Sequence, residues 1–151
     1  MTITAAGWYG PTLRKALVAA PLPSNGLDSD TAVKVLLVTD QYTPDYSSHE
    51  FRDDISGEIP EGGGYSAGGL LLPATTTTVA GGVLTWDAGD VQWTGTISNA
   101  MGAVCYFARG GAASADELIL LADFVNPVST INGPLEVQWS ASGVGYIDFT
   151  P

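Results

Sequence analysis

The second half of the chain alternates short apolar segments with turn residues, and this pattern constrains the fold more than any other feature. The turn signals are Gly81-Gly82, Ala88-Gly89, Gly110-Gly111 and Asn132-Gly133-Pro134. The segments around them predict strands at 70–79, 83–87, 91–96, 103–108, 118–124, 135–140 and 145–149. Many short strands joined by turns are typical of a sandwich or barrel. We therefore predict a mostly β fold: an antiparallel β-sandwich or jelly-roll-like domain with one or two short helices and an N-terminal arm.

Some of these segments also show which side of a strand is buried. Residues 91–94 and 135–139 alternate apolar and polar side chains, as expected for strands with one face in a core. Between two predicted strands, the sequence Ser98-Asn99-Ala100-Met101 predicts one turn of helix.

The first 30 residues differ from the rest. Residues 1–10 predict an arm that carries the apolar pair Trp8-Tyr9, and the apolar spacing after Pro11 predicts a short helix over 11–19. Pro, Ser, Asn, Gly and Asp make 21–30 a loop, and 32–39 reads as the first full strand. We therefore divide the chain into an arm with helix and loop, 1–30, and a β-sandwich domain, 31–151.

The chain carries few charges, and most of them are acidic. Charged residues make up 14% of its 151 residues, and 16 Asp and Glu against 5 Lys and Arg give a formal net charge of −11. Binding to nucleic-acid phosphates or to an anionic membrane needs clustered basic residues, so we expect neither partner. A surface poor in charge favours a protein that works inside an assembly, and we expect a homo-oligomer.

The stretch from residue 42 to 72 has the most specific order of residue types. Ser47 and Glu50 have the spacing of a capping box, and Phe51 and Ile55 lie four apart, so we predict a short helix that ends at Gly57. The glycine-rich residues 62–69 predict a bend into the next strand. They lack the Lys beside Ser or Thr, and the following helix, that a phosphate-binding loop needs.

The candidates for chemistry are single residues without partners in sequence. His49 is the only histidine and has no nucleophile elbow to accompany it, and Cys105 lies in an apolar run typical of a buried residue. One His and one Cys do not make a zinc site. We expect no catalytic residue, no metal and no cofactor, and therefore a protein that is not an enzyme.

Taken in order, the motifs resemble those of small virion structural proteins of tailed bacteriophages and prophages. The resemblance rests on 33–38, then Tyr42-Thr43-Pro44-Asp45, then His49, Phe51, Asp54-Ile55 and Glu58, then Gly64-Tyr65-Ser66-Ala67-Gly68-Gly69. It continues in 85–88, 90–93, 103–106, 120–124 and 137–143. It covers residues 32–150 and leaves out the N-terminal 30.

This resemblance implies a non-enzymatic, β-rich subunit of a virion, assembled in the host cytoplasm. The first expectation is a capsid decoration or cement protein that contacts the major capsid protein or other virion subunits. A tail, tail-tip or fibre-associated subunit is the alternative. A third is a carbohydrate-binding module with Tyr42, Tyr46 and Tyr65 as an exposed aromatic platform. The residues that we expect at assembly contacts are Trp8, Tyr9, Leu13, Leu17, Tyr42, Tyr46 and Tyr65.

Overall fold

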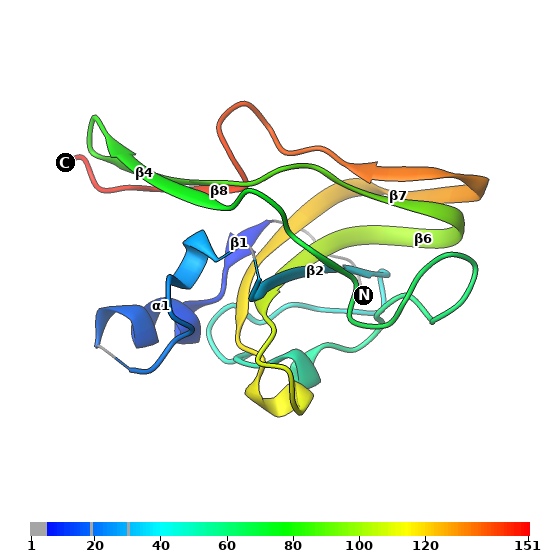
Figure 1. Cartoon of the computed structure of the whole chain (residues 1–151), viewed down its shortest axis with the longest axis horizontal. Helices are drawn as coiled ribbons and strands as arrows, with labels where there is room; N and C mark the ends of the chain where they lie inside the picture. Colours follow the sequence, from blue (N-terminus) through cyan, green and yellow to red (C-terminus); the bar gives the residue numbers. More distant parts are fainter. Residues whose placement is uncertain (1–5, 19, 30) are drawn as a thin grey trace.

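The computed structural model describes residues 6–18, 20–29 and 31–151, which form two antiparallel sheets (Figure 1). The larger sheet has the strand order β1-β7-β6-β2-β3, and the smaller one has the order β4-β5-β8. The strands are β1 (Gly7–Trp8), β2 (Val33–Val38), β3 (Leu70–Leu71), β4 (Thr76–Ala80), β5 (Val83–Asp87), β6 (Val91–Phe107), β7 (Leu118–Val137) and β8 (Gly145–Asp148). One α-helix, α1 (Gly10–Leu17), and three 3₁₀ turns, η1 (Gly26–Asp28), η2 (Arg52–Asp54) and η3 (Ala113–Ala115), complete the fold. The predicted mostly β, sandwich-like architecture is confirmed, while a jelly-roll arrangement stays a prediction.

Most predicted strands are present, but several are parts of longer ones. The predictions at 32–39, 83–87 and 145–149 correspond to β2, β5 and β8, and the prediction at 70–79 divides into β3 and β4 around Pro73. The segments 91–96 and 103–108 belong to one strand of 17 residues, β6. The segments 118–124 and 135–137 belong to one strand of 20 residues, β7.

The predicted helical turn at 98–101 is wrong, because these residues continue β6 through a corner. Asn99 has a positive φ of 57°, and the pairing of β6 with β7 shifts register on both sides of Ala100. The shift between Ala100 and Gly102 leaves extra residues in β7 around Val125, and a further shift between Gly95 and Ile97 leaves one around Ile131. Bulges let a strand bend sharply and pass from one sheet to another. β6 and β7 therefore each take part in both layers of the fold, and β6 bends at residues 98–101.

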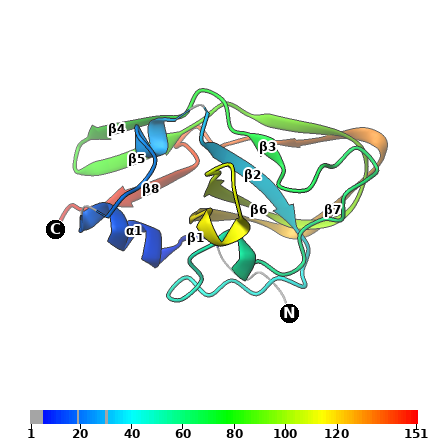
Figure 2. The same ribbon diagram turned by 60° about the horizontal axis from the view of Figure 1, so that its bottom comes forward.

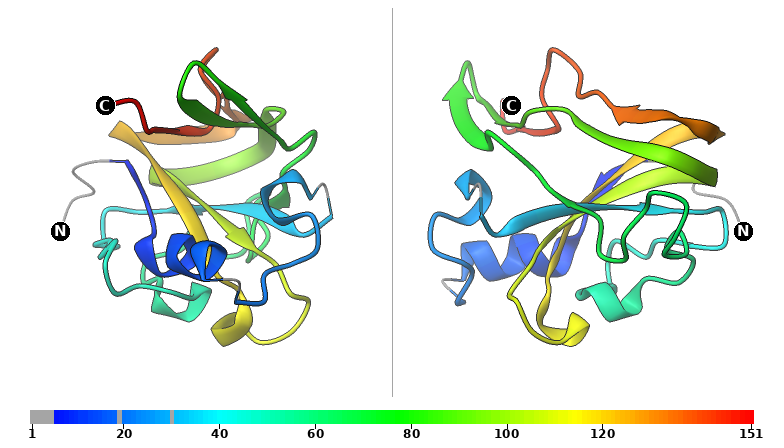
Figure 3. Two further views of the ribbon diagram at one scale, coloured as in Figure 1. Left: turned by 90° about the vertical axis from the view of Figure 1, so that its left-hand side faces the viewer. Right: turned by 45° about the vertical axis from the view of Figure 1, so that its right-hand side comes forward.

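The bend gives the molecule an upper and a lower side, as Figure 3 shows. We call the smaller sheet together with residues 91–97 and 125–137 the upper layer. It packs Trp86, Trp93 and Leu135 against β2 and the lower parts of β6 and β7, in one apolar core. The other face of the larger sheet holds a second core, built around Leu36, Val104 and Leu121. The larger sheet is therefore buried on both faces.

Residues 39–69, which we call the crossover, cover this second core. They pass below the larger sheet in Figure 1 and return to it at Gly69. The predicted capping box and helix are wrong, because other groups take the same amides. Asp45 Oδ1 accepts from the N–H of Ser47 and Ser48 (2.9 and 3.1 Å), which leaves one short turn there. Asp54 Oδ2 accepts from the N–H of two preceding residues, and only the 3₁₀ turn η2 follows.

The glycine-rich part of the crossover packs backbone against backbone. A Cβ on Gly64 would strike the carbonyl of Thr94, and one on Gly95 would strike the carbonyl of Gly63. Gly64 also has a positive φ of 94°, and the N–H of Thr96 donates to the carbonyl of Gly63 (2.7 Å). These glycines therefore let the crossover lie directly on β6.

The N-terminal segment belongs to the β domain where it is described. Gly7 and Trp8 pair with Leu121 and Leu120 of β7, and Tyr9 is fully buried. The arm predicted for residues 1–10 is therefore wrong for 6–10, and residues 1–5 lie outside the described residues. The predicted helix is confirmed as α1, with Pro11 in its first turn, although residue 19 is not described. Figure 2 shows α1 beneath the smaller sheet. Among the described residues, no helix is long and apolar enough to cross a membrane.

Candidate assembly surface

The seven residues predicted at assembly contacts divide between the interior and the surface. Tyr9, Tyr42 and Tyr65 are buried within the chain. Trp8, Leu13 and Tyr46 are half-buried: the Trp8 ring lies 5.9 Å from that of Trp86, and Tyr46 packs on Tyr9 at 5.3 Å. Leu17, at the end of α1, is 87% exposed. Of these seven residues, Leu17 alone presents most of its side chain to a partner.

Tyr42 and His49 fix the crossover to the N-terminal segment. The hydroxyls of Tyr9 and Tyr42 are 2.9 Å apart, and Tyr42 Oη lies 2.9 Å from Nδ1 of His49. The N–H of Asp45 also donates to this Nδ1 (3.2 Å), and the His49 ring stacks on Tyr42. Burial raises the pKa of Tyr42 to about 12, so this hydroxyl stays protonated. His49 thus holds a packed loop in place.

Tyr65 holds the other end of the crossover. Its hydroxyl donates to Glu58 Oε1 (2.8 Å) and accepts from the N–H of Leu37 (3.1 Å), while its ring lies 6.1 Å from that of Trp93. Glu58 also accepts from the N–H of Gly68 (2.6 Å). Two of the three tyrosines expected to form a sugar platform are therefore interior, and that expectation is wrong.

Three of the five basic residues form ion pairs on the lower side of the molecule. Arg52 pairs with Asp116 (2.9 Å), Arg109 pairs with Glu117 (2.7 Å), and Lys15 lies between Glu117 (3.4 Å) and Glu50 (2.7 Å). Burial acts to raise the pKa of Glu117, but the Arg109 hydrogen bond and the nearby positive charges outweigh it and lower that pKa. This cluster joins α1, η2 and the end of the β6–β7 hairpin.

The crossover carries most of the unbalanced negative charge. Between residues 40 and 61 it has one basic residue, Arg52, and seven acidic ones: Asp40, Asp45, Glu50, Asp53, Asp54, Glu58 and Glu61. Five of these side chains, all except Glu50 and Glu58, belong to exposed residues. We call this lower surface the acidic face. The exposed carboxylates of this face favour contact with water.

The upper layer has the opposite character. Residues 70–86 and 124–135 contain no charged residue. At one end of the layer, which we call the overhang, Val79 (65% exposed) and Phe149 (57%) lie at the free end of the smaller sheet, beside Ile147. At the other end, the corner, Val125 (75%) and Ile131 (84%) project from the β7 bulges. Exposed apolar side chains gathered in this way mark interaction sites.

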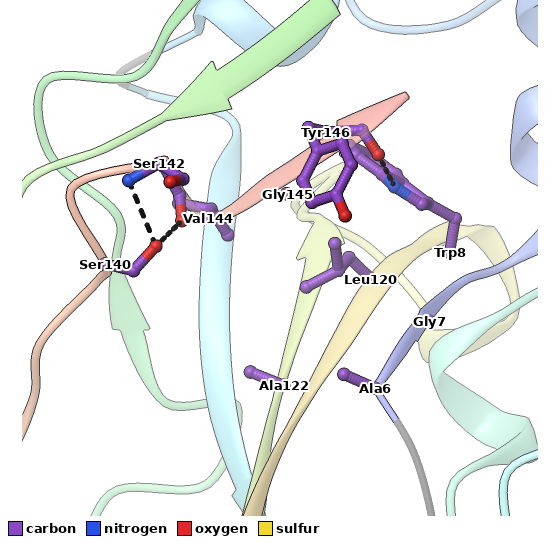
Figure 4. Close-up of a pocket in the computed structure, with 11 residues that line it drawn as sticks. Ala6, Gly7, Trp8, Leu120, Ala122, Ser140, Ser142, Val144, Gly145 and Tyr146 are labelled. Atoms are coloured by element: carbon purple, nitrogen blue, oxygen red, sulfur yellow. Dashed lines mark hydrogen bonds between the residues drawn. The ribbon is translucent and has the colours of Figure 1, made fainter. Parts of the chain in front are cut away.

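A hollow of about 320 Å³ lies between β7 and the turn before β8 (Figure 4). Trp8 and Tyr146 line it, and the Trp8 indole N–H donates to the carbonyl of Tyr146 (3.1 Å). Ser140 and Ser142 also line it, and Ser140 Oγ is occupied within its own turn by Gly143 and Ser142. Among the described residues, no charged side chain lines the hollow.

The residues with catalytic potential lie apart. Cys105 is buried in the core between the layers, and this burial raises the pKa of its thiol. His49 lies on the other side of the larger sheet, in the Tyr42 network. In the described part of the chain, no three His, Cys, Asp or Glu side chains gather in a way that could hold a metal ion.

No family model, curated protein or solved structure matches this chain. The resemblance to phage virion proteins remains a prediction.

The exposed apolar residues at the overhang and the corner were missed by sequence reasoning. Phe149 lies in a segment predicted as a strand, and Ile131 lies beside the turn signal Asn132-Gly133-Pro134; nothing local in the sequence tells that these side chains lie outside the core. The absence of charge over 70–86 and 124–135 was the available signal.

Proposed function

We propose that this protein is a structural subunit of a tailed-phage virion and that it decorates the outside of the capsid. The observation that supports the proposal is the division of its surface. The acidic face lies on the lower side, and exposed apolar residues gather at the two ends of the upper layer, with a further exposed pair, Leu17 and Val18, at the end of α1. A subunit of a shell needs such a division, because one part contacts its neighbours and the other faces water.

The electrostatics agree with an external position. Inside a shell, packaged DNA would repel a chain of net charge −11. On the outer surface of the shell, the chain does not lie next to the DNA. Because Lys15, Arg52 and Arg109 pair with carboxylates, they are not free to bind phosphates. The expected contact residues are therefore the exposed apolar side chains at the overhang and the corner.

The test is to measure where the protein resides and which side chains hold it there. Purified heads and tails are separated, and the protein is quantified in each; decoration predicts many copies in heads, and recovery with tails would favour the tail-associated alternative. Purified protein is then added to expanded heads that lack it. Ile131→Asp should reduce binding, because it places a charge at the corner. Asp53→Asn on the acidic face is the control and should bind as the wild type does.

A further inference from the structure

The two sheets have open edges, and β1, β3, β8 and the uncovered part of β7 are protected against pairing with another chain. β1 and β3 are two residues long. The uncovered part of β7 is broken by bulges and by Pro127 and Pro134. β8 contains Asp148, and its Tyr146 carbonyl is occupied by Trp8. Short strands, bulges, prolines and charges are the devices by which proteins prevent edge-to-edge pairing.

β4 lacks these devices within its own sequence, although η1 contacts it at Thr77. It is a regular five-residue strand, Thr-Thr-Thr-Val-Ala, that pairs with β5 on one side only. Three threonines and a valine favour the extended conformation, and no charge lies within residues 70–86. Asp28 of η1 accepts from the hydroxyl of Thr77 (3.0 Å).

The hydrogen bonds of β5 show which backbone groups of β4 point outward. The carbonyls of Gly82 and Trp86 accept from Phe149 and Val144, on the β8 side. Backbone groups alternate in direction along a strand, so Val83, Thr85 and Asp87 face β4, and their register partners Ala80, Thr78 and Thr76 face β5. The N–H and C=O groups of Thr77 and Val79 therefore face the open edge.

We propose that β4 is a self-association edge, which pairs antiparallel with β4 of a second copy about a two-fold axis at Thr78. In this register Thr77 of one copy lies opposite Val79 of the other, and the two pairs exchange four backbone hydrogen bonds. Thr78 lies directly opposite Thr78 of the second copy, a favourable pair. The smaller sheets of two copies then form one six-stranded sheet.

The charge distribution selects a second copy as the occupant. A contact between two acidic faces would bring like charges together, whereas two β4 edges meet without a charge on either strand. The pairing also places Val79 of each copy at the new contact, whereas Phe149 lies on the far, β8 side of the smaller sheet. Five residues per copy make a small interface, so the free chain forms a weak dimer that becomes effective when many copies sit on one surface. The inference holds for the isolated chain and does not depend on its place in a virion.

The experiment follows self-association of the full chain by sedimentation from low micromolar to about millimolar concentration. The wild type should show a monomer–dimer equilibrium. Thr78→Lys places two ammonium groups opposite each other and should raise the dissociation constant about fivefold or more. Ser98→Lys, the same charge change at an exposed residue of β6, should leave the dissociation constant unchanged. Near-ultraviolet circular dichroism confirms that each variant is folded.

Mixing the Thr78→Lys chain with a Thr78→Glu chain provides the rescue. Lys then lies opposite Glu, and a heterodimer should form more tightly than either variant dimerises alone. A wild type that remains monomeric over the whole range would overturn the proposal. It would also be overturned by a dimer that Thr78→Lys does not weaken, or by a mixture that forms no heterodimer.

Discussion

The acidic face and the upper layer show two opposite ways of handling apolar residues. The crossover beneath the larger sheet carries seven acids, yet Tyr42 and Tyr65 are buried and hydrogen-bonded. The upper layer has long uncharged stretches, yet Val79, Val125, Ile131 and Phe149 remain exposed. The crossover thus buries these two tyrosines, while the ends of the upper layer leave these four apolar side chains exposed. This difference is the reason for proposing that the contact surface lies at the ends of the upper layer, where a partner would bury exposed apolar side chains.

The largest expected effect comes from removing an aromatic ring beneath the acidic face. Tyr65→Ala leaves a cavity beside Trp93 and removes the hydroxyl that Glu58 and Leu37 use, so it should lower the free energy of unfolding by about 3–5 kcal/mol. Ile131→Ala, at the exposed corner, should change it by no more than about 0.5 kcal/mol. Urea denaturation of both variants measures the contrast. Equal losses would mean that the corner is packed within the chain.

A smaller effect should come from the ionic cluster and should depend on pH. The pKa of Glu117 is lowered in the folded chain, so its contribution is present above its unfolded pKa and is lost as the pH falls through the folded value. Glu117→Gln should therefore cost about 1–2 kcal/mol at pH 7 and flatten the loss of stability below about pH 4.5. The measurement is urea denaturation at neutral and acidic pH.

Asp53→Asn is the matched control, because Asp53 is an exposed acid of the crossover, next in sequence to Arg52 of the cluster. It should leave the pH dependence as in the wild type. If Asp53→Asn and Glu117→Gln flattened the curve alike, the loss of stability in acid would not be specific to the ionic cluster.

The smallest effect should occur at the corner. Val125 is a β-branched residue with a positive φ of 66°, a strained conformation, and its side chain is exposed. Asn tolerates this conformation better, so Val125→Asn should stabilise the chain by a few tenths of a kcal/mol to about 1 kcal/mol while weakening attachment to heads. Thermal unfolding and a head-binding assay on the same variant measure the two effects. A destabilised variant would show that Val125 supports the bulge itself.

The sequence predicts the local structure of this molecule better than its surface. Pro11 and the apolar spacing after it predict α1, and the β-branched run at 32–39 predicts β2, because both signals act within a few residues. The corner at Asn99 was mistaken for a helical turn, since only pairing with β7 keeps those residues extended. Tyr42 and Tyr65 were mistaken for surface residues because their hydroxyls find partners far along the chain. Burial of polar-tipped aromatics is decided by tertiary contacts, which no local pattern contains.

The central claim is that the ends of the upper layer make the contacts and that the acidic face remains in water. Hydroxyl-radical footprinting of the free protein and of the protein on purified heads tests it most directly. The account predicts that Val79, Ile131 and Phe149 lose reactivity on the particle, while Tyr46 and Phe51 of the crossover keep theirs. Protection of the crossover with the overhang and the corner still reactive would contradict it.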